Sequence, residues 1–258
     1  MRSDEIREYW NNRAASDQSV QATTNDIFMR YIEVGVLIKA IEKYKPSLVA
    51  DIGCGDGRTT LSLAQSFPMT TFSGIDFAPN MIEIAKSFPR LLNLFFKEGD
   101  VCKPFNALFD MAYSTRCLIN LPSWDMQRQA LFNIRESLLA GGIYVMIENF
   151  IEGHDKMNEM RHSFGLPEIP VRQHNLFFDR ERLKDHIAPW KELSPLWEVL
   201  EEVNISSSYY MMTRGVYARM CQMSGVAPDY GDYHHVLASK LPFAGEYGPV
   251  RMIIMRRK

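Results

Sequence analysis

Polar side chains stand at the ends of several short apolar runs that we expect to be strands. Asp76, Asp100 and Ser114 each follow such a run, and Asp51 closes another just before a glycine-rich turn. The carboxyl ends of parallel strands meet at one edge of a sheet, so we expect these groups to surround a single ligand site. Carboxylates accept hydrogen bonds from hydroxyl and amine groups. The pattern therefore favours a nucleoside-containing ligand.

The glycine-rich turn places Gly53, Gly55 and Gly57 at alternate positions. Glycine tolerates positive φ and lets a ligand approach the backbone closely. A strand-to-helix turn also directs free N–H groups toward a polar ligand. A dinucleotide fingerprint needs its third glycine where Arg58 stands. The turn thus indicates a nucleotide-type cofactor other than a dinucleotide, and a tight turn without a ligand is the alternative.

The apolar runs alternate with helical patterns, which predicts a doubly wound, mostly parallel sheet of the α/β class. The expected strands are 48–52, 70–75, 93–97, 109–113, 143–147, 206–213 and 250–255. The expected helices are 3–14, 26–45, 58–66, 79–87 and 123–140, the last ending at the glycine pair 141–142, with a broken helical stretch at 179–200 and helix again from 214 to 224. Residues 151–178 and 225–248 show no clean period, and the polar segment 16–25 is expected to be mobile.

From about residue 46 to 150 the chain resembles the class I S-adenosylmethionine-dependent methyltransferases. Residues 51–57 match the Asp-x-Gly-x-Gly-x-Gly form of that family's first motif, and 138–142 are similar to its Leu-x-Pro-Gly-Gly, with Ala140 where proline is common. The resemblance implies a seven-stranded sheet whose last strand inserts antiparallel beside the sixth. It also implies S-adenosylmethionine as cofactor, with Asp76 on the ribose and Asp100 and Val101 on the adenine.

An upstream segment, 25–30, looks like an element of bacterial small-molecule and glycan methyltransferases. There an arginine meets the methionine carboxylate and an aromatic N-terminal helix covers the cofactor, which implies these roles for Arg30 and Tyr9. The alternatives are an ion pair between Asp26 and Arg30, and core packing of Tyr9 and Trp10. The expected cofactor-binding set is Tyr9, Arg30, Asp51, Gly53, Cys54, Gly55, Asp76, Phe77, Met81, Asp100, Val101 and Ser114.

The acceptor pocket is expected to come from the irregular segments after residue 150, which form insertions after the fifth and sixth strands. His174 is the first choice for a general base and Glu148 the second. The expected substrate-binding residues are Arg116, Asn149, Arg172 and Tyr210. The alternatives are that His174 is a surface histidine, that Glu148 and Asn149 bond only to nearby backbone, and that the arginines are solvated surface charges.

The 258 residues, 46% of them hydrophobic, predict a single domain with four parts: an N-terminal helical lid (1–45), the cofactor-binding core (46–150), a substrate-side elaboration (151–248) and the last strand (249–258). A net charge of −2 without a basic stripe argues against nucleic acid as partner. The four scattered cysteines argue against a metal site. No run of roughly 20 apolar residues and no apolar leader are found, so we expect a cytoplasmic protein. The oligomeric state is left open.

The segment after the fourth strand lacks the Asn/Asp-Pro-Pro-Tyr and Pro-Cys patterns of nucleobase or amide methylation. Residues 243–250 are similar to tails of methyltransferases that act on surface glycans and secondary metabolites. We therefore expect methyl transfer to a small polar or glycan-type acceptor, at oxygen. The alternatives are an N- or carboxyl-methyltransferase and a cofactor-binding regulator without turnover. An NAD(P)-dependent oxidoreductase is a third alternative, and Arg58 argues against it because a dinucleotide fingerprint needs glycine at that position.

Overall fold

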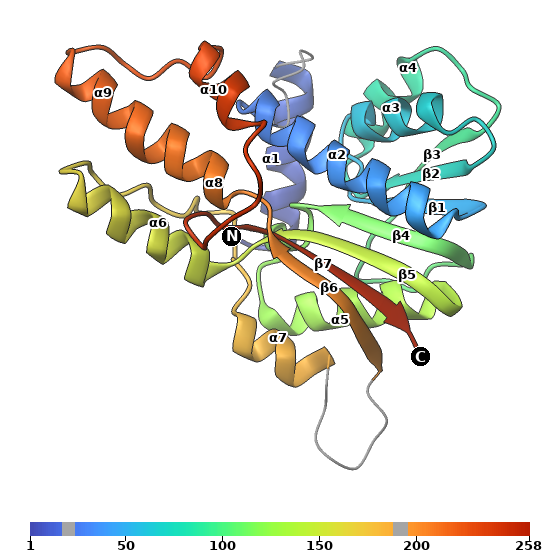
Figure 1. Cartoon of the computed structure of the whole chain (residues 1–258). Coiled ribbons are helices and arrows are strands. Elements are labelled where there is room, and N and C mark those ends of the chain that lie inside the picture. Colours follow the sequence, from blue (N-terminus) through green and yellow to red (C-terminus); the bar gives the residue numbers. More distant parts are fainter. Residues whose placement is uncertain (17–23, 188–195) are drawn as a thin grey trace.

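The protein is described by a computed structural model that covers residues 1–16, 24–187 and 196–258. In these residues a seven-stranded sheet has the order β3-β2-β1-β4-β5-β7-β6 (Figure 1). Its strands are β1 (Leu48–Ile52), β2 (Thr71–Asp76), β3 (Leu94–Glu98), β4 (Phe109–Thr115), β5 (Leu138–Asn149), β6 (Trp197–Asn204) and β7 (Val250–Arg257). Strands β1 to β5 run parallel, and β7 lies antiparallel between β5 and β6. The predicted seven-stranded, mostly parallel sheet is confirmed.

Helices cover both faces of the sheet because successive strand residues are buried on opposite sides. On one face α2 (Ile27–Tyr44) and α3 (Arg58–Ser66) share a hydrophobic core with Val49. On the other face α5 (Trp124–Glu136) and α7 (Arg180–Ile187) share a core with Ala50. In Figure 1, β4 and β5 end toward the helices that follow residue 150.

The N-terminal helix α1 (Ser3–Ser16) packs on α4 (Pro79–Ser87), which follows β2. Asn80 donates to Asn11 from its backbone N–H at 3.2 Å and from its side-chain amide at 3.3 Å. Ala14 packs with Ala78 and Met81. These contacts hold α1 beside the carboxyl end of β2. The neighbouring segment 17–23, most of the stretch expected to be mobile, lies outside the described residues.

The predicted helix 123–140 is wrong in its last turn. Helix α5 ends at Glu136, and the residues from Leu138 onward belong to β5. The pairing of β5 with β4 changes register between Phe109 and Met111, and Gly141 has φ 78°. A glycine pair inside a strand marks such an irregularity as readily as it ends a helix.

The predicted sixth strand at 206–213 is also wrong. The sixth strand is 197–204, which begins inside the stretch expected to be a broken helix and extends beyond it. Residues 207–223 are helical: α8 (Ser207–Tyr210), a π-helical segment (Met211–Tyr217) and α9 (Ala218–Met223). Helices α6 (Ile151–Ser163) and α10 (Tyr233–Ala238) fall in segments expected to be irregular. Strand β6 is an edge strand that leaves Glu198, Glu201 and Glu202 partly exposed, so it lacks the apolar run by which the buried strands were predicted.

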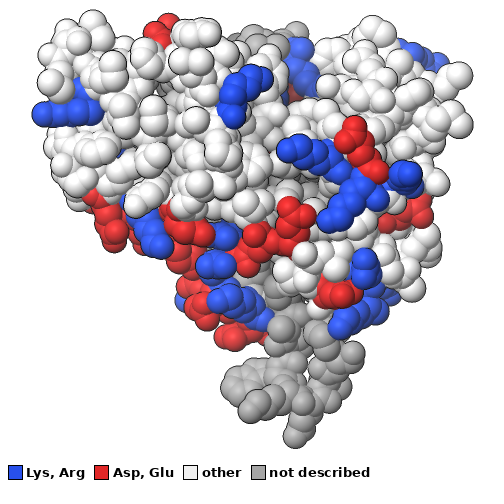
Figure 2. Space-filling view, in the orientation of Figure 1, with Lys and Arg blue, Asp and Glu red and all other residues white. Residues whose placement is uncertain are grey.

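The charged surface is unevenly distributed. Figure 2 shows Lys, Arg, Asp and Glu gathered toward α7 and β6, and few of them over α9 and α10. Exposed apolar side chains there include Met223, Tyr233 and Leu237. Within the described ranges, every helix is too short or too polar to cross a membrane.

Candidate active site

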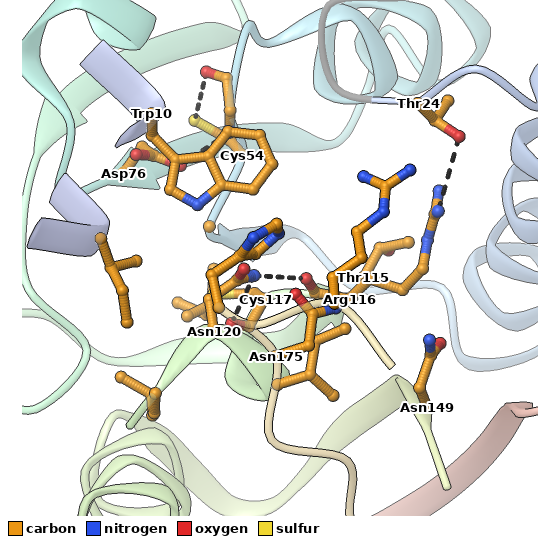
Figure 3. Close-up of a pocket in the computed structure, with 18 of the residues that line it drawn as sticks. Trp10, Thr24, Cys54, Asp76, Thr115, Arg116, Cys117, Asn120, Asn149 and Asn175 are labelled. Atoms are coloured by element: carbon orange, nitrogen blue, oxygen red, sulfur yellow. Dashed lines mark hydrogen bonds between the residues drawn. The ribbon is translucent and has the colours of Figure 1, made fainter. Parts of the chain in front are cut away.

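A cavity of about 400 Å³ lies at the carboxyl ends of the parallel strands. The structure brings most of the predicted site residues into its wall, and Figure 3 shows part of this wall. The predicted residues that line it are Arg30, Asp51, Gly53, Cys54, Gly55, Asp76, Phe77, Met81, Asp100, Val101, Arg116, Asn149, Arg172, His174 and Tyr210. Tyr9, Ser114 and Glu148 do not line it.

The turn after β1 has the backbone conformation that its glycines predict. Gly53, Gly55 and Gly57 all have positive φ, between 52° and 75°. The N–H groups of Gly53 and Cys54 both donate to the carbonyl of Ile75 in β2, at 2.7 and 3.1 Å. The turn is therefore held against the end of the neighbouring strand, with its backbone facing the cavity.

Asp76 is buried and fixed by the backbone. Its Oδ2 accepts the N–H of Gly55 at 2.8 Å and its Oδ1 accepts the N–H of Ala78 at 2.9 Å. Asp100 accepts the N–H of Cys102 in the same way at 2.9 Å. Each carboxylate oxygen keeps a second lone pair for a ligand hydroxyl or amine. Burial raises the pKa of Asp76, and backbone N–H donors oppose that rise.

Asp51 forms a hydrogen-bonded group below the turn. Its Oδ2 accepts the hydroxyls of Thr60 at 2.6 Å and of Tyr113 at 2.8 Å. Burial raises the pKa of this carboxyl to about 7, although both hydroxyls lower it. Burial thus moves the titration of Asp51 toward neutral pH.

Glu148 lies beneath the cavity wall and not in it. Its Oε1 accepts the hydroxyl of Ser114 at 2.8 Å and the N–H groups of Cys117 and Leu118 at 3.2 and 3.0 Å, and its Oε2 accepts the N–H of Ile119 at 3.3 Å. Burial raises its pKa to about 7. This geometry favours a positioning role, because Glu148 shapes the turn after β4, over a role as second base. Ser114 is likewise enclosed.

His174 lies in the cavity wall and is held by α1. Its ring stacks on Tyr9 with the centroids 4.5 Å apart, and Trp10 meets it edge-on at 6.1 Å. Trp10 lines the cavity, whereas Tyr9 supports the histidine from behind. Burial, and then Arg172, lower the pKa of His174. A neutral imidazole at pH 7 has one nitrogen that can accept a proton.

Arg116 follows β4 and forms a buried ion pair in the cavity wall. Its Nε and Nη2 meet the two oxygens of Glu33 in α2, at 2.8 and 3.0 Å. Burial raises the pKa of Glu33, and Arg116 opposes the rise. The backbone of Arg116 has φ 49°, a conformation that costs a non-glycine residue energy and that clusters at functional sites.

Arg214 reaches the cavity from the π-helical segment. It pairs with Asp26 at 2.5 Å, and its guanidinium lies 5.0 Å from the ring centre of Tyr210 and 4.4 Å from that of Tyr230. Asp26 also caps α2 by accepting the N–H of Met29, and it accepts the hydroxyl of Tyr209 at 2.6 Å. Asp26, for which an ion pair with Arg30 was the alternative, thus pairs with Arg214 and links α2 to the C-terminal helices.

Several wall residues were not predicted as part of the site. They come from α1, the start of α2, the end of β4 and the turn after it, the segment from α6 to α7, and the segment between α9 and α10. They include Trp10, Asp26, Glu33, Thr115, Cys117, Asn120, His154, Asn175 and Tyr230. Position at a strand end could have indicated Thr115. The others depend on how helices and turns pack against one another, which the sequence pattern did not predict.

Residues 49–142, which contain β1 to β4 and the start of β5, match the family described as "Methyltransferase domain". They form a class I methyltransferase domain. Domains of this class use S-adenosylmethionine.

The trans-aconitate 2-methyltransferase of Deinococcus radiodurans is 37% identical over 95 residues, which is 37% of this chain and 35% of that protein. The malonyl-[acyl-carrier protein] O-methyltransferase of a Paenibacillus strain is 27% identical over 130 residues, 46% of each protein. The matches thus span less than half of either relative.

The whole described fold is similar to solved methyltransferases. The plantazolicin methyltransferase BpumL in complex with SAH has a TM-score of 0.58 at 12% identity, over 99% of this chain and 90% of that one. The N-methyltransferase NodS from Bradyrhizobium japonicum, also with SAH, has a TM-score of 0.58 at 15% identity, over 98% of both chains. At these identities the likeness shows that the methyltransferase fold extends beyond residues 49–142.

Proposed function

We propose that this protein is an S-adenosylmethionine-dependent methyltransferase that methylates an oxygen of a small acidic acceptor. One observation carries the proposal: a single cavity joins carboxylates at the ends of β2 and β3 to arginines that arrive from the opposite side. The methyltransferase domain at 49–142 supports the cofactor. The arginines support the charge of the acceptor, because guanidinium groups match carboxylates in geometry and charge.

The wall residues fit the cofactor part by part. Asp76 would accept the ribose hydroxyls, and Asp100 with the N–H of Val101 would meet the adenine edge. The backbone of Gly53 to Gly55 and the side chain of Arg30 would hold the methionine end. When bound, the cofactor supplies an already activated methyl group on a sulfonium, so the chain has to align an acceptor oxygen with it and exclude water.

The acceptor would enter between Arg172 and Arg214. Arg214 is positioned by Asp26 and by two tyrosine rings, so it is pre-organised for an anion. Arg172 is exposed at the cavity and makes no ion pair with the residues that the structure describes. The two relatives are named for trans-aconitate and a malonyl group, both carboxylic acids. The glycan-type acceptor stays a prediction.

The need for His174 as a base distinguishes a hydroxyl acceptor from a carboxylate acceptor. A hydroxyl acceptor needs a base, which typically contributes 10²–10⁴-fold, and the lowered pKa and position of His174 fit that task. A carboxylate acceptor is already an anion and needs none. Carboxyl methylation is therefore the second candidate, and the names of the two relatives favour it.

The first test is calorimetric titration with S-adenosylhomocysteine, for which we expect a single site; an absence of binding would sink the proposal. The second test measures the release of S-adenosylhomocysteine with an accepted acid. We expect His174→Ala to lower kcat about 100-fold or more and to flatten the acid limb of the pH profile. The matched control is His162→Ala, because His162 is half-exposed, pairs with Glu168 and lies outside the cavity wall. A fully active His174→Ala would assign the methyl group to a carboxylate.

A further inference from the structure

Four buried oxygen atoms in the cavity wall have no hydrogen-bond partner among the described residues. They are Oγ1 of Thr115 and the Oδ1 atoms of Asn120, Asn149 and Asn175. All four residues line the cavity. Figure 3 shows Asn120 and Asn175 below Trp10, Thr115 beside Arg116, and Asn149 set apart at the lower right. They come from the end of β4, the short helical turn 118–120, the end of β5 and the segment between α6 and α7.

Such a group is unusual, because leaving a buried acceptor unpaired costs about 1–3 kcal/mol and native proteins pair nearly all of them. The buried oxygens of nearby Glu148 are fully paired, as described above. Glu33 Oε1 and Arg116 Nε, which also lack a well-directed hydrogen bond, face each other at 2.8 Å in an ion pair. The four oxygens have no such compensation, and they point to a ligand that brings donors.

Asn120 shows that the unpaired atom is an acceptor. Its Nδ2 donates to the carbonyls of Arg116 at 2.9 Å and of Cys117 at 3.2 Å. Both hydrogens of that amide are therefore used, and the oxygen has to be at the free end. An N–H or O–H group of a ligand would complete it.

The sheet order separates this group from the adenosine side of the cavity. Asp76 and Asp100 follow β2 and β3, whereas Thr115 ends β4 and Asn149 ends β5. Three strand intervals lie between β2 and β5, which is about 14 Å at the usual strand spacing. Asn149 is therefore separated from the adenosine side and lies on the side of the cavity left for the acceptor.

We infer that the acceptor is a hydroxy acid. Its carboxylate binds Arg172 and Arg214, and its O–H groups donate to Thr115, Asn120 and the neighbouring asparagine oxygens. This inference rests on the proposed function and narrows its substrate class. An acid without donors would leave the four buried oxygens unpaired, and the site would discriminate against it.

Matched acids test the inference on the protein saturated with S-adenosylhomocysteine. The probes are malate beside succinate and citrate beside tricarballylate, which differ by one hydroxyl in each pair. We expect the hydroxy acid of at least one pair to bind on the order of tenfold more tightly in calorimetry. Equal binding within both pairs, or no binding of any of the four, overturns the inference while binding of S-adenosylhomocysteine upholds the proposed function. No binding of S-adenosylhomocysteine defeats both.

Thr115→Val removes an unpaired oxygen and keeps the shape of the side chain. We expect it to abolish most of the preference for the hydroxy acid and to leave the Tm of the free protein unchanged or higher. Thr70→Val is the control, because the Thr70 hydroxyl donates to the carbonyl of Pro46 at 3.0 Å, outside the cavity wall. This control should lower the Tm and keep the preference. A Tm loss in Thr115→Val as large as in the control, with the preference intact, would contradict the inference.

Discussion

The two sides of the cavity are built in different ways. On the side of β2 and β3, Asp76 and Asp100 are fixed by N–H groups two residues further along the chain. On the opposite side, Asp26 is fixed by Tyr209 and Arg214, which are 183 and 188 residues away. Local turns thus make the cofactor side, and long-range packing makes the acceptor side. A site of the first kind can be recognised in a sequence, and one of the second kind cannot.

The two sides also differ in charge. The cofactor side presents Asp51, Asp76 and Asp100, which suits hydroxyl, amine and cationic groups. The acceptor side presents Arg116, Arg172 and Arg214 with fewer carboxylates, each of which is already paired. The opposite preferences would keep a cationic cofactor and an anionic acceptor on their own sides of one cavity.

Asp76→Ala should give the largest effect on the cofactor side. It removes two charge-assisted hydrogen bonds to the ligand and the two that hold Gly55 and Ala78. We expect the affinity for S-adenosylhomocysteine to fall by about 2–4 kcal/mol, measured by calorimetry. Asp110→Ala is the control, because Asp110 accepts the N–H groups of Ser47 and Leu48 at the opposite end of the sheet. Unchanged affinity in Asp76→Ala would show that the ribose is bound elsewhere.

Gly53→Ala should disturb the contact between the turn after β1 and the turn after β4, where the two sides of the cavity meet. A Cβ on Gly53 would lie 2.2 Å from the Sγ of Cys117, which belongs to the turn after β4. We expect a loss of about 2–3 kcal/mol in the free energy of unfolding, from this overlap and from the positive φ. Gly141→Ala separates the two causes, because Gly141 has φ 78° but no atom within 4 Å of its added Cβ. If denaturant titrations give equal losses in the free energy of unfolding for both variants, the contact between Gly53 and Cys117 adds no cost beyond that of the positive φ.

The sequence predicted the cofactor side well for the same physical reason. Strand β1, helix α3 and helix α4 have the predicted bounds, because strand burial, glycine and proline signals all act locally there. The location of the Asp76 and Asp100 carboxylates in the cavity wall was predictable from their positions at strand ends. Glu148 shows the limit of that rule, since a strand-end carboxylate can point beneath the wall as well as into it.

The acceptor side could not be predicted because its elements depend on partners far along the chain. Strand β6 carries glutamates that look helical until β7 is known to cover one of its edges. The helices at 207–223 contain Tyr209 and Tyr210, which look like strand residues until α2 supplies Asp26. The unpaired oxygens of Asn149 and Asn175 have no sequence signal, because an asparagine near a turn usually bonds to its own backbone.

Asp51 offers a test that is specific to the cofactor side and smaller in effect. Its pKa is about 7 in the folded protein, raised by burial, against about 4 when unfolded. The folded state thus holds the extra proton, so this stabilisation is complete below about pH 4 and is lost as the pH rises through 7. We expect the free energy of unfolding to fall over that window by up to about 1.4 kcal/mol per pH unit for each such carboxyl. Glu148 contributes a similar slope.

Asp51→Asn should remove one of these two contributions, because an amide oxygen can still accept the hydroxyls of Thr60 and Tyr113. It should also alter ligand binding. The ammonium of S-adenosylhomocysteine near Asp51 would favour the ionised carboxyl, so the affinity should rise between pH 6 and 8 with release of a proton, measured by calorimetry in two buffers. In Asp51→Asn that dependence should disappear. A pH dependence that survives the substitution would place the ammonium away from Asp51, and the cofactor side would then attract its ligand through Asp76 and Asp100 alone.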